Sequence, residues 1–266
     1  MISTPVVVLW SGGYDSTLSL LRYIRSGRNV IALSISSEAT GGVKLRCEKD
    51  SRSKIKQYLS TFGKMCGASV EYLEHTLSPV AYENFSMINF DNAYVRAAGY
   101  ISGSKVFTRQ RIVQPVLWLS GLYAVSPYLP ENCDIAFSYI SSDSSLAYRN
   151  YISSSVENMG KIQGKNFKFV TPLLMSDKED VLMELHTEYP EVFEYCYSCE
   201  NLYHEGPCSN CHPCLNIIQA VSGILLQHIS DEDRDFWTKF LRDKYRVVLE
   251  RIYEGSKEES KYDGSD

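Results

Sequence analysis

The sequence contains neither a long apolar run nor an excess of positive charge. No apolar stretch approaches the ~18 residues of a membrane-spanning helix, so we expect no membrane partner. Residues 1–30 hold no basic segment followed by a long apolar run and a cleavage site, so we expect no secretory signal. The formal charge is -5, whereas nonspecific nucleic-acid binders normally carry a strong basic excess. These absences favour a cytoplasmic location.

Several common site patterns are missing as well. The glycines near the N-terminus come with neither the lysine of a Walker P-loop nor the spacing of a G-x-G-x-x-G dinucleotide fold. The five histidines include no pair at H-E-x-x-H spacing. We therefore expect His75, His186 and His228 to be surface or core residues rather than bases.

What is present indicates a single α/β enzyme. The chain has 266 residues, of which 44% are hydrophobic and 22% charged, enough for a full core without disulfides. Apolar strand segments alternate with helical ones, which is typical of a Rossmann-like, doubly wound parallel sheet with five strands. An aromatic stretch over 76–108 is longer than an ordinary connection and suggests a lid or substrate loop. The expected strands are 5–10, 30–35, 68–73, 134–139 and 167–170, and the expected helices between or after them are 17–26, 50–65, 112–125, 148–159 and 177–187.

The first strand leads directly into a glycine-rich hexapeptide, Ser11-Gly12-Gly13-Tyr14-Asp15-Ser16. Small residues between a buried strand and a helix let backbone N–H groups close around a phosphate, and the helix dipole adds positive potential. Serine hydroxyls are further donors, and Asp15 is suited to hold Mg²⁺ or to cap the helix. An ordinary strand–turn–helix with a capping residue is the alternative. The residues we expect to bind nucleotide are Ser11, Gly12, Gly13, Asp15, Ser16 and Thr17.

A cysteine cluster lies near the other end of the chain. Cys199, Cys208, Cys211 and Cys214 follow the pattern C-x8-C-x2-C-x2-C, and Cys196 precedes them as a spare. Four thiolates at close spacing suit a tetrahedral Zn²⁺ ion, and four protein ligands leave no position for a catalytic water, so we expect a structural zinc. An iron–sulfur cluster and a set of disulfides are the alternatives, the disulfides being disfavoured because the cysteines crowd together.

The zinc-bearing part continues into helices over 215–229 and 231–253. We therefore expect an α/β domain over 1–195 and a zinc-binding helical segment over 196–254 packed on it. The charged residues 255–266 are predicted to be a disordered tail.

The loop and the cysteine pattern together resemble the 7-cyano-7-deazaguanine synthase family of PP-loop ATP pyrophosphatases. V-F-T-R-Q over 106–110, T-P-L-L over 171–174 and S-D-K-E over 176–179 are similar to further family motifs, so the resemblance covers roughly 5–220. It implies an adenine nucleotide alpha hydrolase-like fold. The chain departs from the family over 36–42 and 141–148, where Asp143 is the one residue left of a substrate loop. The departures leave the exact substrate open.

The resemblance implies that ATP adenylates 7-carboxy-7-deazaguanine, a deazapurine acid, and that ammonia converts the adenylate to an amide or nitrile, with release of AMP and pyrophosphate. It implies Mg²⁺, a homodimer, and catalytic roles for Asp15, Arg109 and Lys178. For the two cations, a solvated helix start at Arg109 and a surface ion pair at Lys178 are the alternatives. Two other functions stay open: conjugation of the acid to a protein or nucleic-acid acceptor, as in phage modification or antiviral defence, and a non-catalytic nucleotide-binding module. Sulfur transfer to tRNA is a weaker possibility.

Overall fold

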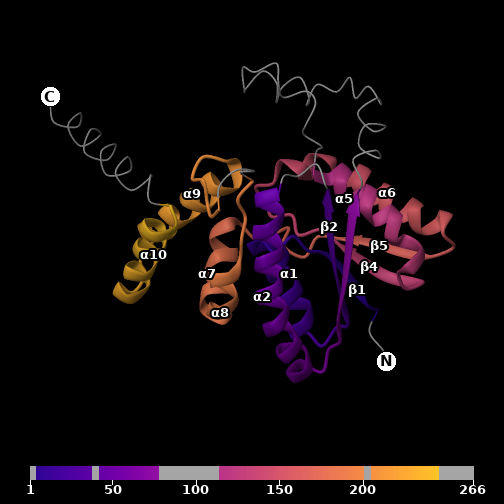
Figure 1. Cartoon of the computed structure of the whole chain (residues 1–266), viewed down its shortest axis with the longest axis horizontal. Helices are drawn as coiled ribbons and strands as arrows, with labels where there is room; N and C mark the ends of the chain where they lie inside the picture. Colours follow the sequence, from indigo (N-terminus) through magenta and orange to yellow (C-terminus); the bar gives the residue numbers. More distant parts are fainter. Residues whose placement is uncertain (1–3, 38–41, 78–113, 201–204, 246–266) are drawn as a thin grey trace, which may run out of the picture.

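The computed structural model describes residues 4–37, 42–77, 114–200 and 205–245. Its centre is one five-stranded parallel sheet with strand order β3-β2-β1-β4-β5 (Figure 1). The strands are β1 (Val6–Leu9), β2 (Val30–Ser37), β3 (Val70–Leu77), β4 (Asn132–Ala136) and β5 (Asn166–Val170).

Helices connect the strands and complete the chain after the sheet. Because every pair of neighbouring strands is parallel, each connection must return to the same end of the sheet. The α-helices are α1 (Tyr14–Arg25), α2 (Gly42–Cys66), α5 (Gln114–Val125), α6 (Arg149–Ile162), α7 (Lys178–Glu188), α8 (Pro190–Tyr195), α9 (His212–Leu226) and α10 (Asp231–Lys244), and the short 3-10 helices are η3 (Ser126–Tyr128) and η4 (Ser144–Tyr148).

The two faces of the sheet bury two separate cores. Side chains alternate along a strand, so Val6 and Val8 enter one core while Val7 and Leu9 enter the other. The first core lies under α1, α2 and α7 to α10, and the second lies under α5 and α6 (Figure 1). This arrangement confirms the doubly wound α/β fold.

Several element boundaries differ from the sequence-based expectation. The helix expected over 50–65 begins at Gly42. The sequence did not indicate this earlier start, because the buried residues of the helix lie only between Ser51 and Gly63 and its first turns show no apolar stripe. The strand expected over 134–139 ends at Ala136, which pairs with Val170, the last residue of β5. β3 extends to Leu77, whereas an irregular segment was expected from 76, and the rest of that expected segment lies outside the described residues. Helix α8 was not expected.

The C-terminal helices are part of the first core. Cys199 and Cys214 are buried in that core together with Val6 of the central strand. None of the described helices is both long and apolar enough to cross a membrane. The expected tail over 255–266 and the last part of the helix expected over 231–253 lie outside the described residues.

Candidate functional site

The glycine-rich loop lies where β1 ends, at the carboxyl edge of the sheet. Gly12 has a φ of +90°, a left-handed conformation that favours glycine. Gly13 is the N-cap of α1, and no side chain of the described residues caps this helix. The first turn therefore presents backbone N–H groups that an anion can satisfy.

The serine hydroxyls brace the loop from within. Ser11 Oγ accepts a hydrogen bond from the Gly13 N–H at 3.2 Å, and Ser16 Oγ accepts one from the Ser11 N–H at 3.3 Å. The two hydroxyls are themselves 3.2 Å apart. Thr17 lies beneath the loop, where its fully buried hydroxyl accepts from the Trp10 indole N–H at 3.1 Å. Five of the predicted nucleotide-binding residues thus form the loop, and Thr17 supports it.

An ion pair joins the loop to a helix far along the chain. Lys178 Nζ lies 2.6 Å from both Asp15 carboxylate oxygens, and its side chain is only 14% exposed. Lys178 is the first residue of α7, whose start is fixed by a capping box between Asp177 and Asp180. Lys178 therefore does not form a surface ion pair with its sequence neighbours. The structure instead brings this predicted residue to the loop.

Asp143 interacts electrostatically with both members of the same ion pair. Its carboxylate accepts a hydrogen bond from the Ile140 N–H at 2.9 Å. Burial raises the pKa of Asp143, and the negative charge of Asp15 raises it further, while the Ile140 hydrogen bond and the cation of Lys178 lower it. Asp143, Asp15 and Lys178 thus belong to one electrostatic cluster. Arg109, the third predicted catalytic residue, lies outside the described residues.

Three residues that the sequence analysis did not identify bind the carbonyl groups of the loop. Ser51 Oγ and the Tyr197 N–H both donate to the Gly12 carbonyl, at 3.0 and 3.1 Å. Arg52 donates to the Ser11 carbonyl at 3.1 Å. One signal was available, because Arg52, Ile55 and Leu59 are spaced by three and four residues, which places a cation on the buried stripe of α2.

Replacing Gly12 with alanine is expected to destabilise the protein by about 1–3 kcal/mol, because a side chain would be strained at this φ. A Cβ atom at Gly12 would also lie 3.0 Å from Arg52 Cγ and 3.1 Å from Ser51 Oγ. Urea unfolding measures the loss. Gly42→Ala is the matched control, since a Cβ at Gly42 meets nothing within 4 Å. Equal stability of the two variants would contradict the strained conformation.

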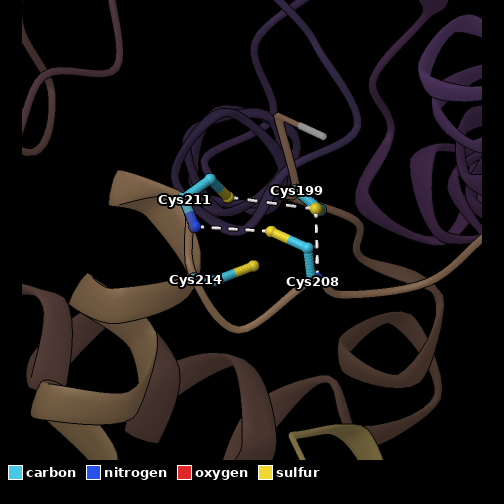
Figure 2. A group of neighbouring side chains, drawn as sticks. All are labelled: Cys199, Cys208, Cys211 and Cys214. Atoms are coloured by element: carbon cyan, nitrogen blue, oxygen red, sulfur yellow. Dashed lines mark hydrogen bonds between the residues drawn. The ribbon is translucent and has the colours of Figure 1, made fainter. Parts of the chain in front are cut away.

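The four predicted metal ligands come together in space. The side chains of Cys199, Cys208, Cys211 and Cys214 gather in one place (Figure 2), and their Sγ atoms all lie within 4.8 Å of one another. Cys199 Sγ accepts the Cys208 N–H and Cys208 Sγ accepts the Cys211 N–H, both at 3.3 Å. None of the eight cysteines forms a disulfide in this structure. This geometry excludes the disulfide alternative in this structure.

The sulfur positions fit a single tetrahedral ion. Zn–S bonds of about 2.3 Å place tetrahedral sulfurs about 3.8 Å apart, and Cys199 and Cys211 Sγ are 3.9 Å apart. Hydrogen bonds from the Cys214 thiol and the Glu200 N–H lower the pKa of Cys211, against the effect of burial. Cys196 is not part of the group, and burial raises the pKa of its thiol to about 12.

Comparisons with known proteins find similar chain folds. NMN synthetase from Francisella tularensis is similar with a TM-score of 0.41 and 16% identity, over 91% of this chain and 86% of that one. The U34-tRNA thiolase NcsA from Methanococcus maripaludis, with its [4Fe-4S] cluster, is similar with a TM-score of 0.43 and 17% identity, over 91% of this chain and 74% of that one. No protein-family model and no curated protein matches the sequence.

Proposed function

We propose that this protein is an ATP pyrophosphatase that activates a carboxylic acid by adenylation. The observation that carries the proposal is the uncapped start of α1 beside the Asp15–Lys178 ion pair. The backbone N–H groups of the loop and the Lys178 ammonium are both suited to an anion with several phosphate oxygens. Both lie at the carboxyl edge of a doubly wound sheet, where such folds bind their ligands.

Each residue of the site has a separate role in this proposal. The Gly12 N–H and the N–H groups of the first turn of α1 bind the pyrophosphate part of ATP. Lys178 neutralises the charge that develops on the leaving pyrophosphate, and Asp15 keeps that ammonium in place before ATP binds. The Asp15 carboxylate is also the group at the loop that would hold Mg²⁺, which supplies further charge neutralisation on the phosphates.

The reaction removes two obstacles that make a carboxylate a poor electrophile: its negative charge and its oxide leaving group. A carboxylate oxygen attacks the α-phosphorus of ATP, the bond from that phosphorus to the bridging oxygen breaks, and pyrophosphate leaves. Ammonia then attacks the acyl carbon, AMP leaves, and loss of a proton gives the amide. The amide oxygen then attacks the α-phosphorus of a second ATP and pyrophosphate leaves. Loss of AMP and of both protons of the amide nitrogen gives the nitrile.

The acid we propose is 7-carboxy-7-deazaguanine, on the strength of the sequence resemblance. Asp143 supports this assignment, because its half-buried carboxylate lies in the same electrostatic cluster as Asp15 and Lys178. A carboxylate there is suited to accept N–H groups of a guanine-like ring. The neighbouring residues over 141–148 differ from the family, and they are the place where the choice of acid would change.

We also propose that the four cysteines hold a structural Zn²⁺. The sulfur spacing supports one ion rather than a cubane cluster, which binds its thiolates on different iron atoms and so spreads them farther apart. Four thiolates around Zn²⁺ leave no open coordination position. The ion would therefore fix the segment that follows α8 and contribute no reacting atom.

The experiment is to incubate the protein with ATP and Mg²⁺, with and without 7-carboxy-7-deazaguanine, and to measure pyrophosphate, AMP and the organic products by mass spectrometry. Acid-dependent release with an amide or nitrile product is the expected result. Acid-dependent release without either product would indicate an adenylate that waits for a protein or nucleic-acid acceptor. An absence of release with this acid and with a panel of related acids would contradict the enzymatic proposal and favour a nucleotide-binding module.

A further inference from the structure

The carbonyl groups of the glycine-rich loop are held by two other parts of the chain. α2 supplies Ser51 Oγ, which donates to the Gly12 carbonyl at 3.0 Å, and Arg52 Nη1, which donates to the Ser11 carbonyl at 3.1 Å. The Tyr197 N–H adds a second bond to the Gly12 carbonyl at 3.1 Å. All three groups donate to carbonyl oxygens of the loop.

The direction of these bonds fixes the direction of the loop amides. In a trans peptide, the carbonyl of one residue and the N–H of the next point in opposite directions, and no cis peptide occurs in the described residues. Holding the Ser11 carbonyl toward Arg52 therefore turns the Gly12 N–H away from α2. Holding the Gly12 carbonyl toward Ser51 turns the Gly13 N–H away from α2 as well, and that N–H is found on Ser11 Oγ.

The residues on α2 are also well placed to hold this geometry. Ser51 and Arg52 are each only 3% exposed, so water does not compete for their donors. Glu48 Oε2 lies 3.9 Å from Arg52 and Oε1 lies 3.7 Å from Lys44, so Glu48 holds the Arg52 side chain against its own helix.

We propose that Ser51 and Arg52 are positioning residues, which hold the loop carbonyls so that the loop N–H groups face a bound pyrophosphate. The pyrophosphate in this inference rests on the proposed function, while the positioning itself concerns the ligand-free chain. Neither residue touches the reacting atoms. Their effect is to preorganise the donors, so that the loop is not reordered when the anion binds.

Hydrogen exchange of the ligand-free protein tests the positioning. Ser51→Ala removes one donor, and Arg52→Met removes the other while keeping most of its volume. We expect amide exchange in the peptide that covers residues 11–16 to rise about 5-fold to 10-fold in each variant, the effect of losing one net hydrogen bond. Ser53→Ala on the exposed side of the same helix is the matched control. Loop exchange equal to that control in both variants would overturn the proposal.

Calorimetric titration with Mg²⁺ and inorganic pyrophosphate measures the consequence for binding. We expect the Kd to rise about 10-fold in Ser51→Ala and Arg52→Met. Arg52→Lys separates charge from geometry, because lysine keeps the cation but not the planar fork. Wild-type affinity in Ser51→Ala together with full rescue by Arg52→Lys would overturn positioning in favour of a charge effect.

The same titration separates the two proposals. A wild-type protein that fails to bind pyrophosphate would contradict the proposed function, whereas the exchange of the ligand-free loop still decides whether Ser51 and Arg52 position it. If Arg52→Met does not fold, Ser51→Ala decides alone, since it removes a single hydroxyl group. Urea unfolding of each variant distinguishes a local change in the loop from a global loss of stability.

Discussion

Replacing Asp15 with alanine is expected to reduce pyrophosphate release to below about one hundredth of the wild-type rate, the usual effect of losing a preorganised electrostatic group. Asp15 holds the Lys178 ammonium with two contacts of 2.6 Å. Without it, Lys178 loses its only ion-pair partner among the described residues and no longer stays at the loop. The Asp15 side chain is 29% exposed, so the fold should stay intact.

A second ion pair between the same two helices provides the control. Arg22 of α1 pairs with Glu184 of α7, well along both helices from the loop. Glu184→Gln therefore weakens the contact between α1 and α7 without changing the site, and it should keep near-normal turnover. Lys178→Met should reduce the rate of pyrophosphate release as much as Asp15→Ala does. Unchanged turnover in Asp15→Ala, measured as pyrophosphate released with the acid present, would remove Asp15 from the mechanism.

The fold was predictable because the central strand can be recognised from its own short stretch of sequence. The central strand is apolar on both faces, as Val6 to Leu9 are all buried between two layers of helices. Such a run, followed by glycines and a helix, has few other structural interpretations. The start of α2 was not predictable in the same way, because the stripe that shows its period begins only at Ser51.

The residues of the site likewise fall into those that a local sequence pattern indicates and those that only the packing of the chain brings together. The loop residues and the four cysteines are contiguous or closely spaced, so their spacing alone indicates what they form. The contacts of Ser51, Arg52 and Tyr197 depend on how α2 and the segment after α8 pack behind the loop, which no local pattern contains. Lys178 lies between these cases. The resemblance implied a role for it, its acidic sequence neighbours left a surface ion pair as the alternative, and only the fold brings it to Asp15.

The four-cysteine group and the loop are connected through the backbone. The Tyr197 N–H holds the Gly12 carbonyl, and Cys199 follows two residues later. A Cβ atom on Gly13 would also meet the Ser198 hydroxyl at 3.0 Å. The segment that ends in Cys199, the first of the proposed metal ligands, therefore forms one wall of the loop. We expect a change in the four-cysteine group to alter the loop through this segment.

Cys211→Ser is expected to lose the metal and the soluble yield together, because a structural ion contributes its binding free energy to folding, about 10–16 kcal/mol for small zinc domains. Plasma mass spectrometry of the purified protein measures metal per chain, and we expect one zinc in the wild type rather than several irons. Cys66→Ser is the matched control, since this half-buried cysteine at the end of α2 lies outside the four-cysteine group.

Cys196→Ala tests the assignment of the spare cysteine. Its thiol is buried, and burial raises its pKa to about 12, so it is held as a neutral packing group rather than as a thiolate. This variant should lose some stability but keep its zinc. A normal metal content in Cys211→Ser, or a loss of metal in Cys196→Ala, would contradict the four ligands.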